Sequence, residues 1–233
     1  MDWWHVIGLP DGSVTPGAWD LREVSQQLPW PDVAGKRCLD VGTADGFWAF
    51  ELERRGAAYV LATDAPSPFQ ARSRERFEHA RELLGSAVEY EARDVFRLEG
   101  EWDVVVMGYV LQMLRDPIGA LEHLRSVCRG HLLLLETISL PLELLPSPVA
   151  RLDARHDGRE WFVFNRRGLR KATELAGWEV EEQTGVLHDK AGPLPEAQKA
   201  SRSWKYRLGI RGRSCALRAV PTGPPTRFFG DSG

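Results

Sequence analysis

The 233 residues suffice for one well-buried α/β domain and are few for two. No run approaches about 18 apolar residues, and the N-terminal MDWWH shows neither a basic stretch nor a cleavage site, so we expect a soluble, cytoplasmic protein without a membrane partner. The net charge is −3, but Lys and Arg number 14 against 23 Asp and Glu in residues 1–150, and 16 against 10 in residues 151–233. The three cysteines are too widely spaced for a disulfide framework, a zinc site or an iron–sulfur cluster, so no metal is expected.

Residues 1–34 form an N-terminal extension that contains four tryptophans, Trp3, Trp4, Trp19 and Trp30. The sequence Pro10-Asp11-Gly12 is typical of a turn between two short β-prone runs, and Pro29 ends a short helix that follows them. We therefore predict a small hairpin and a helix, which either cover an edge of the main sheet or form a roof over a pocket.

The following stretch, KRCLDVGTADGFWAFELERRG, predicts a strand over residues 37–41, a tight turn over residues 42–46 and a helix that Gly56 ends. Such a turn presents backbone N–H groups and a helix N-terminus to a ligand. The dinucleotide fingerprint G-x-G-x-x-G fails here, and a P-loop would need a lysine and a hydroxyl that the turn lacks. What remains is an acidic residue followed by small residues at every second position, Asp40-x-Gly42-x-Ala44-x-Gly46.

The next predicted strand, residues 59–64, ends in Asp64. A carboxylate at the end of the second strand of a βαβ unit accepts hydrogen bonds from the two ribose hydroxyls of a nucleoside. Asp64 is therefore the strongest single candidate for a ligand-binding residue.

Helices and strands alternate along the rest of the chain. We predict helices over residues 69–84, 118–128 and 166–176, strands over residues 88–92, 102–107, 131–137, 178–184 and 214–220, and an irregular insertion at 141–164 that lies over the active site. The expected fold class is α/β: a Rossmann-like, seven-stranded, mostly parallel sheet with the last strand antiparallel and helices on both faces. This domain would span residues 35–220, and residues 221–233 would be a flexible tail.

The turn and the order of strands resemble the class I S-adenosylmethionine (SAM) methyltransferases over roughly residues 36–220, with Ala44 in place of the middle glycine of their D/E-x-G-x-G-x-G motif. The segments LDVGTADGFWAFELERRGA, VLQMLRDP, LLLLET and WFVFNRRGLRKATELAGW are similar to the branch that contains the tRNA wobble-uridine carboxymethyltransferases. The resemblance implies S-adenosyl-L-methionine as cofactor and S-adenosyl-L-homocysteine as product. It implies cofactor contacts at Asp40, Gly42, Thr43, Ala44, Gly46, Asp64, Ala65, Asp94, Val95 and Gly108.

Two departures distinguish this chain from the tRNA enzymes, which use carboxy-SAM. Gln112-Met113 stands where they have a Tyr-His pair, and Thr15-Pro16-Gly17 stands nearest to their Lys-Gly-Pro-Phe element, whose lysine meets the extra carboxylate. Arg155 or Arg159 could supply a counter-charge instead. Plain SAM is therefore the expected cofactor.

The candidate catalytic residues are His156, His5 and Tyr109, although a structural role is the alternative for each histidine. Tyr109 lies where the family places the incoming nucleophile. We expect a methyltransferase that acts on a small molecule, as a monomer or homodimer. The alternatives are a tRNA-modifying enzyme, suggested by seven basic and no acidic residues in residues 199–218, and a non-catalytic SAM-binding protein.

Overall fold

The computed structural model describes residues 2–152, 161–193 and 213–222. Its main sheet has eight strands among these residues, in the order β10-β12-β6-β5-β2-β3-β4, with β9 also paired to β12. The strands are β2 (Arg37–Val41), β3 (Tyr59–Asp64), β4 (Glu89–Ala92), β5 (Trp102–Gly108), β6 (Cys128–Thr137), β9 (Trp178–Gln183), β10 (Leu187–His188) and β12 (Arg213–Pro221).

The sheet is mixed, as an α/β fold with an antiparallel last strand predicts. Strands β4, β3, β2, β5 and β6 pair in parallel, and β12 lies antiparallel to both β6 and β9. The sheet differs from the expected seven strands because the two residues of β10 pair with the start of β12. The predicted helix 118–128 ends at Val127, one residue early, and the gap expected before the strand 131–137 is absent, because β6 begins at once with Cys128.

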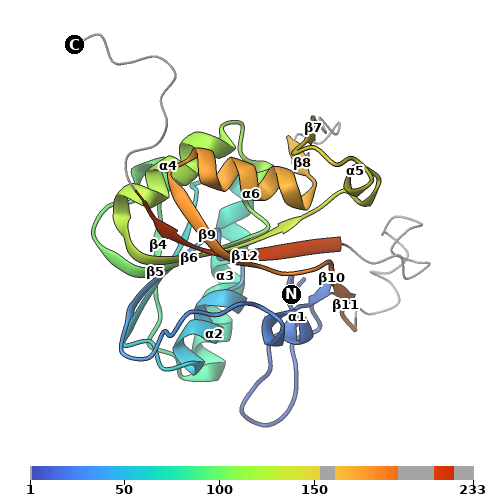
Figure 1. Ribbon diagram of the computed structural model, residues 1–233. Helices are drawn as coiled ribbons and strands as arrows, with labels where there is room; N and C mark the ends of the chain where they lie inside the picture. The colour runs from blue at the N-terminus through green and yellow to red at the C-terminus, as the bar shows by residue number, and fades with distance from the viewer. Residues whose placement is uncertain (1, 153–160, 194–212, 223–233) are drawn as a thin grey trace.

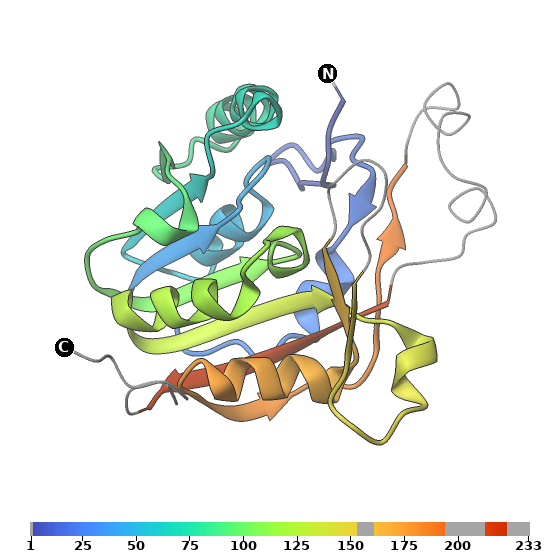
Figure 2. The ribbon, with the colours of Figure 1, turned by 90° about the horizontal axis from the view of Figure 1, so that it is seen from above.

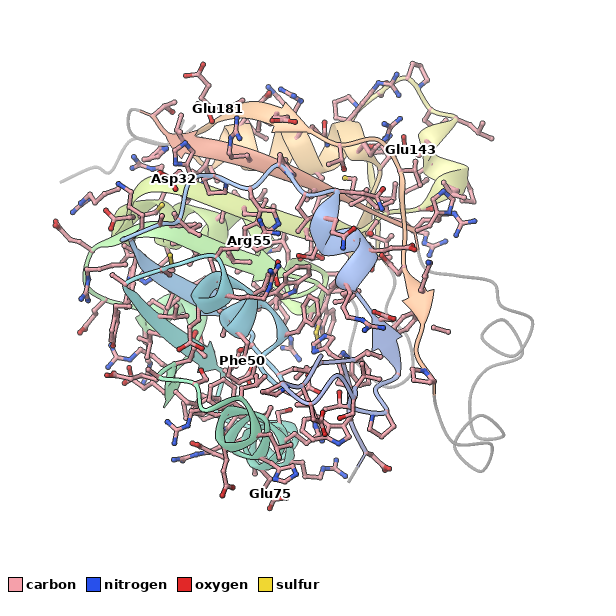
Figure 3. All side chains as sticks on the ribbon, turned by 90° about the horizontal axis from the view of Figure 1, so that it is seen from below. Asp32, Phe50, Arg55, Glu75, Glu143 and Glu181 are labelled. Carbon is pink, nitrogen blue, oxygen red and sulfur yellow. The ribbon has the colours of Figure 1, made fainter. Side chains whose placement is uncertain are left out.

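Helices cover both faces of the sheet (Figure 1). On one face, α4 (Pro117–Val127) and α6 (Arg166–Leu175) pack on one buried cluster, and on the other α1 (Arg22–Gln26), α2 (Phe47–Arg54) and α3 (Pro68–Leu84) pack on a second. Figure 3 shows Phe50 between α2 and α3, where its ring stacks on Phe77 at 5.2 Å.

Side chains of Ser67, Asp116 and Asn165 accept backbone N–H groups at three helix starts, and such caps each contribute about 1 kcal/mol.

The N-terminal extension lies at the end toward which the parallel strands point (Figure 2). Its turn contains a single antiparallel bridge between Gly8 and Val14, which is less than the predicted hairpin. The strand β1 (Trp19–Asp20) pairs antiparallel with β11 (Lys190–Ala191). We call residues 3–20 together with residues 187–191 the roof, because both segments lie beside the carboxyl ends of the strands.

The insertion 141–164 is more regular than predicted. It contains α5 (Leu140–Glu143) at its start and an antiparallel hairpin of β7 (Ala150–Leu152) and β8 (Phe162–Phe164). The backbone N–H of Trp161 donates to the carbonyl of Gln112 at 2.7 Å, which ties the hairpin to the loop after β5. In the part of the chain that the structure describes, no helix combines the length and apolar character that a bilayer crossing requires.

Candidate active site

The turn between β2 and α2 follows the carboxyl end of a central strand. Gly42, Ala44 and Gly46 all have left-handed backbone conformations, with φ of 77°, 50° and 96°. Glycine adopts this conformation freely, whereas Ala44 pays a steric cost of about 1 kcal/mol. The alternating small residues of the motif therefore have a structural reason, and Ala44 is the one strained member.

Asp40, the acidic residue of the motif, is fully buried at the end of β2. No hydrogen bond of normal geometry reaches either carboxylate oxygen from the described residues, although the hydroxyl of Thr43 and the backbone N–H of Ala49 lie close enough to favour its ionised form. Burial raises the pKa of Asp40 to about 7, although Thr43 and the charge of His5 act in the opposite direction. A buried carboxylate without a partner is costly in a folded protein unless a ligand supplies the missing partner.

Asp64 ends β3 beside the same turn. From the described residues it accepts two long hydrogen bonds, one from the backbone of Ala44 at 3.4 Å and one from the hydroxyl of Tyr90 at 3.5 Å. Burial is the main cause that raises the pKa of Asp64 to about 7, and the charges of Asp40 and Asp45 add to it. Its oxygens therefore have capacity to accept stronger hydrogen bonds, such as those from a diol.

A cavity of about 570 Å³ opens next to Asp64 at the carboxyl ends of β3 and β4. It is lined by Pro66, Ala92, Arg93, Asp94, Arg97 and Glu99. Asp94 accepts the backbone N–H of Phe96 at 2.9 Å with one oxygen, and Val95 beside it is buried. Ala65, also predicted to contact the cofactor, is exposed directly after Asp64. Of the predicted residues, Asp94 lines this cavity, and Asp64 lies beside it through the pairing of Asp64 with Ala92.

The carboxyl ends of the strands also concentrate polar atoms that have no partner. Among the described residues, eight buried side-chain nitrogen or oxygen atoms make no hydrogen bond, and six of them lie at this end of the sheet. The six atoms are both carboxylate oxygens of Asp40, Thr43 Oγ1, Trp48 Nε1, Gln112 Oε1 and Glu136 Oε2. Because buried polar groups in native proteins are normally satisfied, this concentration indicates the site of a polar ligand.

Two carboxylates that were not predicted from the sequence hold the backbone of the site. Asp45, in the turn, accepts the N–H groups of Trp4 and His5 at 2.7 and 2.9 Å, and its other oxygen contacts His5 Nδ1. Glu136, at the end of β6, accepts the N–H groups of Val110 and Leu111 at 2.9 and 2.7 Å. Burial raises the pKa of Glu136 to about 8 in spite of these bonds.

Tyr109 follows Gly108 at the end of β5 and has a left-handed backbone, with φ of 61°. Its hydroxyl donates to Asp189 at 2.7 Å and lies 3.3 Å from Ser214 Oγ, which donates to the same Asp189 oxygen at 2.6 Å. Burial and the charge of Asp189 raise the pKa of Tyr109 well above its usual value. Burial also raises the pKa of Asp189 above its usual value.

Most of the predicted site residues lie together at one end of the sheet, and a few lie outside the described residues. The turn, Asp64 and Gly108 lie at one end of the sheet, and the indole of Trp48 packs so closely on Gly108 that a side chain there would overlap it. His5 belongs to the same region through Asp45. His156, Arg155 and Arg159 lie outside the described residues. Asp45 and Asp189 had no local signal, because their partners are 40 and 80 positions away.

Solved structures of SAM-dependent methyltransferases share this fold. One from Mesorhizobium loti matches with a TM-score of 0.55 and 18% identity, over 82% of this chain and 93% of its own. The magnesium protoporphyrin IX methyltransferase ChlM from Synechocystis PCC 6803, solved with bound SAH, has a TM-score of 0.54 and 16% identity, over 87% and 78%. TehB from Haemophilus influenzae has a TM-score of 0.57 and 15% identity, over 82% and 59%. At these identities the likeness shows the fold alone.

The sequence itself carries the assignment to a family. A family model described as a methyltransferase domain matches residues 18–183. The chain therefore belongs to the methyltransferase-domain family, and the family implies SAM as the methyl donor. None of the curated proteins matches the sequence. The narrower resemblance to the tRNA wobble-uridine branch stays a prediction.

The residues present fit SAM. The unbonded carboxylate of Asp40 suits the ammonium group of the methionine part, and the weakly bonded Asp64 suits the ribose diol. The cavity that Asp94 lines adjoins Asp64 and would take the adenine. No group of three or more His, Cys, Asp or Glu side chains in the described residues is arranged to hold a metal ion.

Proposed function

We propose that the protein transfers a methyl group from SAM to a small-molecule acceptor. The observation that carries the proposal is the set of six unbonded polar atoms at the carboxyl ends of the strands, beside a roof that is attached to the turn itself. Ligands of open α/β sheets bind at this end of the strands. The roof contacts the turn through Asp45, and an acceptor site next to a covered turn would suit a compact molecule better than a long polymer.

Different residues would bind the methyl donor and the methyl acceptor. SAM supplies an electrophilic methyl group on its sulfonium, and the protein's main contribution is to align the two reactants. Asp40 and Asp64 would hold the donor. Tyr109 would meet the acceptor, because its hydroxyl donates to Asp189 and so presents its oxygen lone pairs to an acceptor O–H or N–H. Asp189 then positions that hydroxyl, and its raised pKa suits it to receive the proton.

The fold neighbours include enzymes of both acceptor classes, since a putative RNA methyltransferase from Pyrococcus horikoshii shares the fold as well as ChlM. ChlM acts, by its name, on magnesium protoporphyrin IX, a compact molecule. The same fold therefore serves small-molecule methylation in a structure that is similar over 87% of this chain. The atom that receives the methyl group here would be an oxygen or nitrogen that must lose a proton.

A tRNA acceptor is the second candidate, and one surface observation favours it. A groove of about 500 Å³ on α6 is lined by four cations, Arg166, Arg167, Arg170 and Lys171, and by Glu143 and Glu174. Three of the four cations already pair with those two glutamates, which reduces their attraction for phosphate. Most of the basic segment 199–218 lies outside the described residues.

Label transfer separates the candidates. The protein is incubated with methyl-labelled SAM and, in parallel, with a small-molecule cell extract or with total tRNA. The proposal expects label in the small-molecule arm and none in tRNA. Label in tRNA alone, with retention of tRNA that falls steeply as salt rises, would establish the second candidate instead. SAM binding without label transfer in either arm would favour a non-catalytic SAM-binding protein.

Asp64→Asn serves as the control for the label experiment. It keeps the shape of the side chain but removes the charge that the ribose hydroxyls would meet, so label transfer and SAM affinity should fall together. A variant that keeps wild-type affinity in calorimetry would overturn the assignment of the cofactor site.

A further inference from the structure

The N-terminal extension places a histidine directly on the turn. The backbone N–H groups of Trp4 and His5 both donate to Asp45, at 2.7 and 2.9 Å, and His5 Nδ1 contacts the other oxygen of Asp45. The ring of His5 lies 5.7 Å from the ring of Phe47, the first residue of α2. Four contacts therefore fix a side chain from the start of the sequence at the N-terminus of the helix that follows the turn.

The ring of His5 has one nitrogen left for a ligand. The side chain is only 9% exposed, and Nδ1 is used by Asp45. Nε2 makes no hydrogen bond with any of the described residues. Although burial raises the pKa of Asp45, the charge of His5 and the three hydrogen bonds outweigh burial and lower that pKa below its usual value. A carboxylate ligand on Nε2 requires a proton on both ring nitrogens, and the Asp45 carboxylate at Nδ1 is the counter-charge that such a ring needs.

The carboxylates around the turn provide no counter-charge for the carboxylate group of SAM. Asp40, Asp45 and Asp64 are three carboxylates close enough to influence one another, and the charge of His5 reaches Asp40 as well. The methionine part of SAM carries an ammonium and a carboxylate on the same carbon atom. Asp40 suits the ammonium, but the carboxylate would enter an acidic region, and an unpaired buried charge is costly.

We propose that His5 binds the carboxylate of the methionine part through Nε2, with Asp45 as the residue that positions it. This inference rests on the assignment of SAM to the turn and deepens it. His5 lies outside residues 18–183, which the family model matches. The role replaces the general base predicted for His5 from the sequence, because a ring fixed to Asp45 at the turn serves the donor. The extension is then a part of the cofactor site.

Two ligands that differ only in the carboxylate test the proposal by calorimetry. The first is S-adenosylhomocysteine, and the second is its decarboxylated analogue, 5′-S-(3-aminopropyl)-5′-thioadenosine. The wild-type protein should bind the first about tenfold or more tightly than the second, the size of effect expected for one charge-assisted hydrogen bond. His5→Gln should lose most of that preference by weakening S-adenosylhomocysteine, while its affinity for the analogue changes less than about threefold.

The ratio of the two ligand affinities, taken within each variant, distinguishes a direct contact with the carboxylate from a structural role of His5. If His5 only shapes the turn, His5→Gln weakens both ligands equally and keeps the preference, and this result would overturn the proposal. His131→Gln is the matched control, since His131 lies at the opposite end of the sheet, beside the start of β5, and should leave both affinities unchanged. A wild-type protein that binds neither ligand would instead remove the cofactor assignment, on which this inference depends.

Discussion

At the scale of single residues, Tyr109 combines a strained backbone with a buried, fully engaged hydroxyl. A non-glycine residue with φ of 61° is uncommon and costs about 1 kcal/mol or more. The backbone N–H of Tyr109 donates to Leu135 at 2.7 Å, and its hydroxyl is fixed by Asp189. The strain is therefore maintained by contacts on both sides of the residue, and it directs the ring from the end of β5 toward β12.

Tyr109→Phe should lower kcat for the acceptor found by label transfer about 10²-fold, because the variant loses the hydroxyl that meets the acceptor proton. Its affinity for S-adenosylhomocysteine should not change, since the donor is held by Asp40 and Asp64. Kinetics and calorimetry on the same preparation measure the two effects.

Ser214→Ala is the companion variant. It removes the second hydrogen bond to the same Asp189 oxygen but leaves the phenol in place, so its loss of kcat should be much smaller. Equal losses in the two variants would mean that the cluster of Tyr109, Asp189 and Ser214 only joins β5 to β12.

The residues that the sequence predicted and those that it missed differ in the distance over which they act. The positions of Gly42, Gly46 and Asp64 at one end of the sheet could be predicted, because a strand end and a turn of fixed spacing determine them. Asp45 and Asp189 act on partners 40 and 80 positions away, and no local pattern contains that pairing. Glu136 could have been suspected, because it directly follows four leucines near the carboxyl end of β6.

At the scale of elements, periodicity predicted the long strands and helices, whose boundaries agree within a few residues. It could not predict β1, β10 and β11, since strands of two residues carry no alternation. These short strands build the roof through pairing across most of the chain, Trp19 with Ala191. The hairpin of β7 and β8 was missed for a similar reason, because Pro-rich and charged residues surround it.

The extension passes close to itself at Gly17, and this contact offers a test of the roof. A methyl group on Gly17 would overlap the backbone carbonyl of His5, which cannot move without disturbing Asp45. Gly17→Ala should therefore lower the affinity for S-adenosylhomocysteine about tenfold and lower Tm by several degrees. Gly8→Ala is the control, because open space surrounds Gly8 in the same segment. If both variants behave alike, the extension is not coupled to the turn.

At the scale of the whole molecule, the site makes the ligand-free protein less stable as pH rises. In the unfolded chain, Asp and Glu lose their protons near pH 4. In the folded protein the pKa of Asp40 and of Asp64 is raised to about 7, and that of Glu136 to about 8, by burial. Between about pH 4 and pH 8 the folded state therefore binds more protons than the unfolded state, so the free energy of unfolding falls as the pH rises.

Thermal unfolding should show this dependence, with a lower Tm at pH 8 than at pH 5.5. Asp40→Asn removes one of the buried charges, so it should raise Tm at pH 8 by about 2–4 °C for each kcal/mol recovered, and should change Tm little at pH 5.5. The same variant should bind S-adenosylhomocysteine more weakly. Glu75→Gln, on the exposed face of α3 (Figure 3), should leave the pH dependence unchanged. A wild-type Tm that rises from pH 5.5 to 8 would contradict the argument.

The pairing of β1 with β11 also determines when the site can form during synthesis of the chain. The turn, Asp40 and Asp64 leave the ribosome early, but the roof beside them needs residue 191, and the sheet needs β12 from residue 213 onward. Contacts of such long sequence separation form late and slowly. A nascent chain would thus carry its acidic turn open to water until the ribosome has passed residue 191, and the sheet beside that turn would be complete only after β12 has been made.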